Sequence, residues 1–309
     1  MAVVPRAIPV GRADLRSGAS DNGAMVPEPT FRTVVLDWQP DPAMVLLLVL
    51  AAGLYWGGVR RLGQRAAPRR WPPARSAAFG TGLATIAFAT SSGLARYDTV
   101  LLSLHTVQHV LLGMLAPMLL ALGAPVTLAL QASGRPMQQV LLKAVHHPVI
   151  AALTSPVVAW VLFGGTLFAL YFSPLFELSL RNDVVHQAVH VHFLVVGGLF
   201  CWTAVGLDPM RRRIGHPARL LFVLLAVPFH AFLGLAVLSS DTHPLGGAVY
   251  GAVDRSWGST LIADQHVAAG VLWAVGDLFG VLAGAVVVAQ WMTADARRQA
   301  REDRRLDAV

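Results

Sequence analysis

The sequence predicts an all-α polytopic membrane protein, a bundle of seven transmembrane helices with the N-terminus outside and the C-terminus in the cytoplasm. Three observations lead to this prediction. The 309 residues are 55% hydrophobic and only 13% charged, with a mean hydropathy of +0.58, whereas soluble domains are about 25% charged. The apolar residues gather in seven long runs, and the arginines gather in alternate connections between these runs.

The seven apolar runs follow one another along the chain, and each approaches the roughly 20 residues that a membrane-crossing helix needs. In order, they cover residues 43–59, 77–94, 99–122, 149–172, 184–205, 218–238 and 264–291. The second run is the weakest, because it is rich in Gly, Ala, Ser and Thr. Small residues let helices approach closely in lipid, so we expect this span to be buried among the others.

The orientation follows from the basic residues, which favour cytoplasmic connections. The connections after spans one, three and five and the C-terminal segment hold most of them, whereas the alternate connections hold one arginine each: Arg96, Arg181 and Arg255. The positive-inside rule therefore predicts an outer N-terminus and a cytoplasmic C-terminus. The net charge of +7 is explained by this topology and does not indicate a nucleic-acid partner; the lipid bilayer is the expected surrounding.

The chain outside the spans divides into two tails. Residues 1–36 are expected to form a disordered N-terminal tail, residues 37–292 the seven-span domain, and residues 293–309 a basic cytoplasmic tail. Residues 1–30 contain no apolar core of a cleavable signal peptide. The single cysteine, Cys201, excludes an intramolecular disulfide and any paired-cysteine metal motif.

The histidines within the spans give the clearest functional signal, because all of them fall toward the predicted outer end. They are His105, His109, His186, His190, His192, His230 and His266. Ionisable residues inside a membrane are costly and usually functional. Neutral imidazole is the commonest protein ligand for metals and suits copper, zinc and iron.

The spacing of these histidines places four of them in two pairs. His105 and His109 are four residues apart, as are His186 and His190, so each pair projects from one helix face. His192 lies about 200° round from His190 and faces elsewhere. The pattern predicts a metal site formed by the two pairs, although a polar network or proton path remains an alternative. His230 and His266, at similar depth, are further candidate ligands.

Other side chains bear on the chemistry of this site. Asp277 lies deep in span seven and either orients a ligating histidine or fixes helix packing. Asp264, beside His266, leaves open a catalytic zinc site, which needs a carboxylate base. Met114 and Met118 each follow a paired histidine by nine residues. In a regular α-helix that spacing is half a turn off the ligand face, so we expect both methionines only to pack.

Several strings in the sequence resemble one known family. They include DWQPDPAM (37–44), HTVQHVLLGMLAPMLLALGAP (105–125), HQAVHVHF (186–193), GLDP (206–209) and DQHVAAGVLWAVGDL (264–278). These strings, in this order, resemble the multi-span cytochrome c oxidase assembly factors of the CtaG type found in Gram-positive bacteria. The resemblance implies a multi-pass protein of the bacterial plasma membrane that helps to mature a haem-copper oxidase, with copper supplied to the catalytic subunit.

The histidine pattern and the resemblance together predict a non-enzymatic assembly factor. It would hold copper, with Cu(I) favoured, near the outer face and pass it to the catalytic subunit of cytochrome c oxidase in the same membrane. The expected ligands are His105, His109, His186 and His190, followed by His230 and His266. The alternatives are a membrane metalloenzyme using zinc or iron at the same histidines, with Asp264 or Asp277 as acid and base, and a copper-uptake protein. Haem as the bound group and the oligomeric state are left open.

Overall fold

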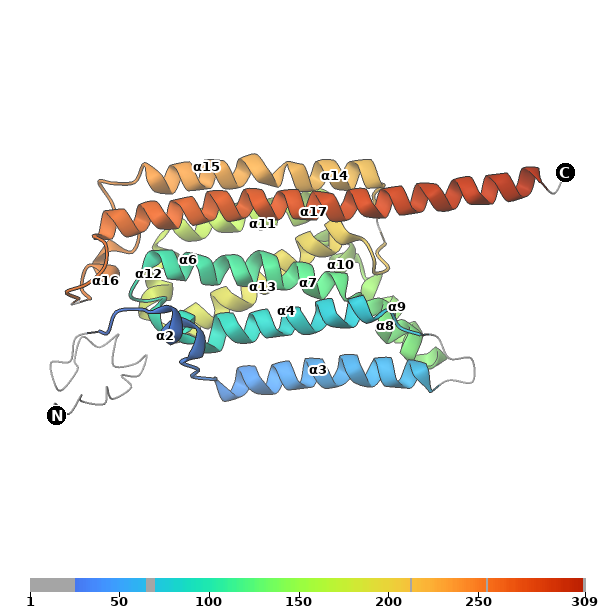
Figure 1. Cartoon of the computed structure of the whole chain (residues 1–309), viewed down its shortest axis with the longest axis horizontal. Coiled ribbons are helices and arrows are strands. Elements are labelled where there is room, and N and C mark those ends of the chain that lie inside the picture. The colour runs from blue at the N-terminus through green and yellow to red at the C-terminus, as the bar shows by residue number, and fades with distance from the viewer. Residues whose placement is uncertain (1–25, 65–69, 212, 254, 308–309) are drawn as a thin grey trace.

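Long helices lie side by side along one axis (Figure 1). The computed structural model describes residues 26–64, 70–211, 213–253 and 255–307, and within these ranges every regular element is a helix. Six helices are long and apolar enough to cross a membrane, or seven if one bent pair counts as a single span. The predicted all-helical membrane architecture is therefore confirmed; which end faces outward stays a prediction.

The six long helices include several that are built from consecutive segments. They are α3 (Pro42–Gly63); α4 (Pro73–Ser91) with α5 (Gly93–Tyr97); α6 (Leu102–Val110) with the π-helix η1 (Leu111–Leu115), α7 (Ala116–Leu122) and α8 (Pro125–Ala132); α13 (Asp183–Val205); α14 (His216–Leu224) with α15 (Ala226–Leu238); and α17 (Leu261–Leu306). The shorter helices are α2 (Phe31–Leu36), α9 (Arg135–Val145), α10 (Pro148–Leu153), α11 (Pro156–Tyr171), α12 (Pro174–Arg181) and α16 (Gly247–Tyr250).

The fourth predicted span, residues 149–172, is not one continuous helix. It divides into α10 and α11, and α11 is followed by α12 at a bend of 74°. Each new helix begins at a proline, Pro156 or Pro174. Proline lacks the N–H that would continue the preceding helix and is favoured in the first turn of a new one, which explains both breaks.

The long helices differ in how far the rest of the protein covers them. In the most apolar stretch of α3, only 6% of the residues are buried inside the protein. In the corresponding stretch of α4 with α5, 56% of the residues are buried. On α4, a Cβ at Gly82 would lie 3.1 Å from the backbone nitrogen of Leu120. This close approach is what the small residues of the second span predicted. Helix α3 therefore lies at the edge of the bundle, where its apolar side chains are free to contact lipid.

Part of the predicted N-terminal tail forms a helix. Residues 1–25 of the predicted disordered tail lie outside the described residues, but α2 forms within residues 26–36 and is capped at Thr30. Trp257 Nε1 donates a hydrogen bond to the carbonyl oxygen of Val26, and Arg96 forms an ion pair of 2.5 Å with Asp37. Composition could not show these contacts, because their partners lie far along the chain. The basic segment from residue 293 to Leu306 continues α17 as a helix (Figure 1).

Candidate functional site

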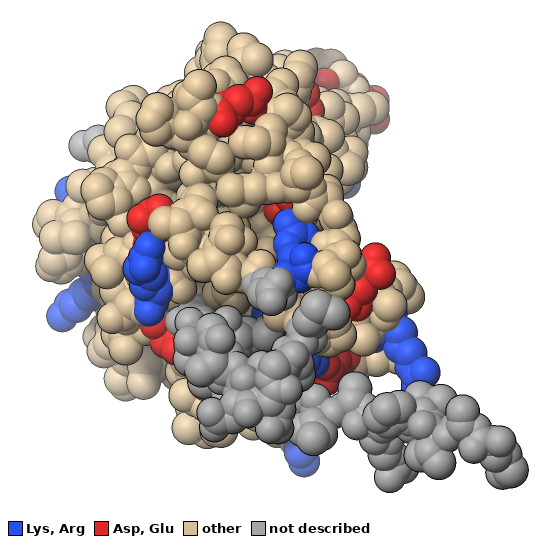
Figure 2. Space-filling view, turned by 90° about the vertical axis from the view of Figure 1, so that its left-hand side faces the viewer, with Lys and Arg blue, Asp and Glu red and all other residues tan. Residues whose placement is uncertain are grey.

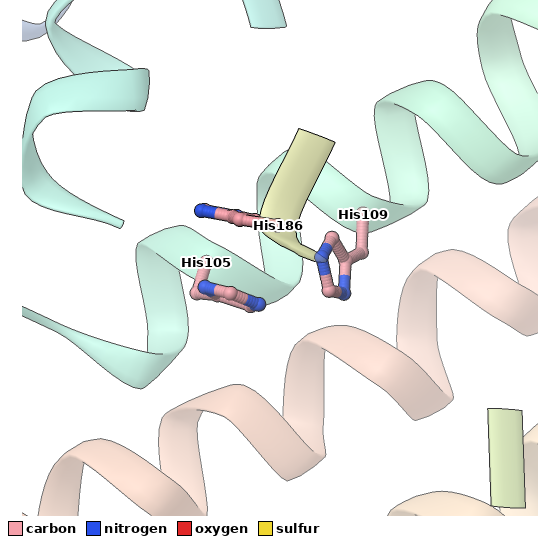
Figure 3. Close-up of side chains that lie close together, drawn as sticks. All are labelled: His105, His109 and His186. Atoms are coloured by element: carbon pink, nitrogen blue, oxygen red, sulfur yellow. The ribbon is translucent and has the colours of Figure 1, made fainter. Parts of the chain in front are cut away.

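Four histidines from two helices meet in the interior. α6 carries His105 and His109, α13 carries His186 and His190, and all four side chains are at most 2% exposed. The ring centroids of His105 and His109 are 4.1 Å apart, those of His186 and His190 4.3 Å, and those of His105 and His186 5.3 Å. Figure 3 shows His105, His109 and His186 gathered in one place. The structure thus brings the two predicted pairs together into one histidine cluster.

The histidine cluster contains two overlapping groups of potential metal ligands. Single nitrogens of His105, His109 and His186 lie within 4.8 Å of one another, and so do ligand atoms of Asp98, His186 and His190. Imidazole nitrogens bound tetrahedrally at about 2.0–2.1 Å are roughly 3.4 Å apart. The side chains would have to close in slightly to hold an ion. His109 Nε2 is buried with no hydrogen-bond partner among the described residues, so it is available as a ligand.

Hydrogen bonds set the orientation of two of these rings. His105 Nδ1 lies 3.1 Å from the carbonyl oxygen of Asp98, so Nδ1 is the protonated nitrogen and Nε2 carries the lone pair. Gln108 donates through Nε2 to the carbonyl oxygen of Ala89 at 2.8 Å, which turns its Oε1 toward His190 Nε2 at 3.1 Å. His190 must therefore donate from Nε2 and present Nδ1. Metal-binding histidines in proteins are usually oriented by such outer partners.

Asp98 is a site residue that sequence reasoning missed. It follows α5, is 0% exposed, and its Oδ2 lies 3.7 Å from His186 Nε2. Its carbonyl oxygen also accepts a hydrogen bond of 3.1 Å from the hydroxyl of Tyr250. Burial, and then the nearby Asp98, raise the pKa of Tyr250 well above its usual value, which keeps the hydroxyl protonated as a donor. The only sequence signal was a carboxylate just before the third apolar run.

His230 lies close to the histidine cluster but in neither ligand group. It is 1% exposed and donates through Nδ1 to the carbonyl oxygen of Ala226 at 2.9 Å. Its Nε2 is buried and has no hydrogen-bond partner in the part of the chain that the structure describes. His230 and His109 both line one cavity of about 20 Å³, which has room for about one water molecule.

The same cavity is lined by Met114, which was expected only to pack. Met114 is 5% exposed and follows His109 by five residues, and the π-helix η1 begins within this interval, at Leu111. A π-turn brings residues five apart onto the same face, unlike an α-turn. Pro117 follows η1 and cannot donate to the carbonyl of Gly113, which removes the α-helical bond there. Met114 is packed in the hydrophobic core, as expected, and the irregular helix at this point also brings it to the cavity that His109 lines.

Two histidines of the spans face outward from the bundle. His266 Nε2 lies 2.9 Å from Asp241 Oδ1, and its side chain is 42% exposed. Sequence position gave its depth but not its direction around α17, so the structure does not bring it into the cluster. His192 is exposed and lies 3.0 Å from Thr166 Oγ1. It faces away from the cluster, as its spacing predicted.

The two candidate aspartates of span seven take different places. Asp264 accepts hydrogen bonds from the hydroxyl and the backbone N–H of Ser103, at 2.5 and 3.3 Å. It therefore holds the first turn of the helix that carries His105. Asp277 is half-buried. The adjacent Gly276 packs directly against His230, because a Cβ added at Gly276 would lie 2.5 Å from His230 Cγ. Asp277 is thus close to His230 rather than to the two histidine pairs.

A family model matches most of the chain. The match covers residues 53–294, and the family is described as the cytochrome c oxidase caa3 assembly factor. This range contains all four histidines of the cluster and Asp98. No solved structure matches the chain.

Relatives with similar sequences occur in mycobacteria. An uncharacterized protein of Mycobacterium bovis and one of Mycobacterium tuberculosis are each 36% identical over 287 residues, covering 91% of this chain and 43% of the relative. An uncharacterized protein of Mycobacterium leprae is 36% identical over 269 residues, covering 85% of this chain and 40% of the relative. The chain therefore spans about two fifths of the length of these relatives. By its match over residues 53–294, the chain belongs to the Caa3_CtaG family of cytochrome c oxidase caa3 assembly factors.

Proposed function

We propose that the protein assists the assembly of a haem-copper cytochrome c oxidase by holding copper, as Cu(I), at the histidine cluster. Copper is cargo in this proposal, and the recipient is the catalytic subunit of the oxidase in the same membrane. The observation that carries the proposal is the meeting of His105, His109 and His186 nitrogens within 4.8 Å in a buried interior. The family membership supports the oxidase as the partner.

The donor set favours a soft ion with few ligands. Imidazole and thioether groups suit copper, and Met114 lines the cavity that His109 also lines. Asp98, beside His186, would offset part of the positive charge of a bound ion in a medium where isolated charges are costly. A catalytic zinc keeps an open position for water and substrate. The burial of all four histidines favours holding an ion over converting a substrate.

The test is the metal content of the purified full chain. Protein loaded with Cu(I) under reductant is compared with a His105→Ala/His109→Ala variant and with His192→Ala, which removes an exposed histidine from α13. We expect the double variant to lose bound copper and His192→Ala to retain it. Loading with Zn²⁺ in parallel identifies the preferred metal. Equal copper in all three proteins, or zinc bound in place of copper, would contradict the proposal.

A further inference from the structure

A large basic cavity lies at the end of the bundle opposite to the histidine cluster. It has a volume of about 860 Å³ and lies between the end of α13, the connection to α14, and the later part of α17. Its basic lining residues are Arg75, Arg213, Arg219, Arg297, Arg298 and His216, and no Asp or Glu is among its described lining residues. From this cavity we infer a binding site for a phosphate group, carried by an anionic phospholipid or by free phosphate.

The arrangement of the arginines goes beyond what membrane topology requires. The positive-inside rule explains why basic residues occur in the connections. It does not explain why they surround one cavity. Here Arg75 comes from the start of α4 and Arg298 from α17. Within the described ranges, none of the lining arginines forms an ion pair with a carboxylate. A cleft lined by one sign of charge focuses the field and concentrates counter-ions.

Arg219 is held in a fixed position in the wall of the cavity. It is 6% exposed, and its Nη1 donates to the carbonyl oxygen of Val205 at 2.6 Å and to Gln290 Oε1 at 2.9 Å. These bonds hold the guanidinium in place between α13 and α17. Its Nε is buried and has no hydrogen-bond partner among the residues that the structure describes. A buried donor without a partner is costly, so this guanidinium keeps one donor that no described residue satisfies.

The chemistry of the lining fits a phosphate better than other anions. Guanidinium groups bind phosphate oxygens through paired hydrogen bonds, and five arginines line this cavity. The rest of the wall is partly apolar, with Leu122, Leu207, Met210, Ile214 and Val286. Basic pockets between membrane helices take the headgroups of anionic lipids, and apolar walls suit the attached acyl chains. This inference does not depend on the proposed copper function.

The experiment measures retained lipid and thermal stability of the purified full chain in detergent. Phosphatidylglycerol, phosphatidylcholine and inorganic phosphate are added separately, with native mass spectrometry to detect bound lipid. We expect phosphatidylglycerol to bind and to raise the melting temperature, and phosphatidylcholine to do neither. Stabilisation by inorganic phosphate at equal strength would identify free phosphate as the ligand; its failure to stabilise would identify the lipid.

A matched pair of variants separates binding from general charge. Arg297→Gln/Arg298→Gln removes two lining arginines, and Arg301→Gln/Arg305→Gln removes two exposed arginines of the same helix outside the cavity. We expect the first variant to bind phosphatidylglycerol at least about tenfold more weakly, equivalent to about 1.4 kcal/mol, and the second to bind normally. Equal losses of phosphatidylglycerol binding in both variants, or equal binding of the two lipids, would overturn the inference. The arginines would then serve only to determine the membrane topology.

Discussion

The histidines of the cluster differ in which ring nitrogen they present, because each is oriented by a different neighbour. His105 is held through Nδ1 by the carbonyl of Asp98, and His190 through Nε2 by Gln108. The hydroxyl of Tyr171 lies 3.5 Å from His109 Nδ1. A cluster oriented in this way loses little freedom when it closes on an ion, since the rings are already positioned.

A shared metal site predicts strongly non-additive substitutions. Removing one ligand, as in His105→Ala, should cost most of the metal affinity, and removing His186 in addition should cost little more. Independent structural histidines would instead give separate, additive losses of stability with no change in metal binding. The measurement is copper affinity of single and double variants under reductant, with circular dichroism to check folding.

Gln108 provides a test of the outer partner of His190. Gln108→Leu removes the acceptor, so His190 can turn, and copper affinity should fall about 10- to 100-fold while the amount bound at saturation is unchanged. Gln108→Glu in its protonated form can still donate to the carbonyl of Ala89 and accept from His190, so it should restore most of the affinity. Copper titrations of both variants decide the role. If the Leu and Glu variants behave alike, Gln108 serves only in packing.

At the scale of elements, the cluster depends on how closely α13 approaches the third span. A Cβ at Gly197 would lie 2.0 Å from the carbonyl oxygen of Gly113, in η1. Only glycine permits this contact. This contact joins η1, which follows the helix of His105 and His109, to α13, which carries His186 and His190. It therefore limits the distance between the two histidine pairs.

Gly197→Ala should therefore destabilise the protein by about 1–3 kcal/mol, the usual cost of overpacking, and should lower copper affinity as the helices separate. The control is Gly165→Ala in α11, where an added Cβ would meet nothing within 4 Å. The control should be neutral or slightly stabilising. Thermal unfolding in detergent, together with copper content, measures both effects. Equal melting temperatures for the two variants would show that α13 and η1 can separate without cost.

The whole molecule has two chemically different ends. Figure 2 shows the end at the left of Figure 1, near the beginnings of α6 and α17, where acidic and basic side chains are interspersed on the visible face. The opposite end holds the basic cavity. Which of these two ends faces the outside of the cell stays a prediction.

The topology prediction can be tested by labelling. In a Cys201→Ala background, single cysteines are placed at Ser256 and at Gln139, both exposed. An impermeant thiol reagent applied to intact cells should label the cysteine at 256 and not that at 139, because the basic connections face the cytoplasm. Labelling in permeabilised cells confirms that both sites react. The reverse pattern would place the histidine cluster on the cytoplasmic side.

The assembly role predicts a cellular phenotype. A strain lacking this protein should show reduced cytochrome c oxidase activity while oxidase transcripts persist, because the defect lies in maturation. Complementation with the wild type or His192→Ala should restore activity, and complementation with His105→Ala/His109→Ala should not. Oxidase activity and haem spectra of isolated membranes provide the measurement. Normal activity in a strain that also lacks any paralogue would contradict the role.

The sequence by itself determined the features that depend on local periodicity. The apolar runs predicted the membrane-crossing helices, and the four-residue spacings predicted that His105 with His109, and His186 with His190, share a face. The outward direction of His192 followed from the same geometry. These predictions succeeded because the backbone of a regular helix fixes the relative directions of its own side chains.

Only the tertiary structure decided how the helices face one another and where they depart from regular geometry. The rotation of α17 turns His266 toward Asp241, and the fold brings Asp98 to His186. The π-turn before Pro117 puts Met114 beside the same cavity as His109. Helix rotation and helix pairing depend on packing between segments that are far apart in the chain. In lipid this packing is governed by shape and by interhelical hydrogen bonds rather than by hydrophobicity. A hydropathy pattern therefore cannot predict it.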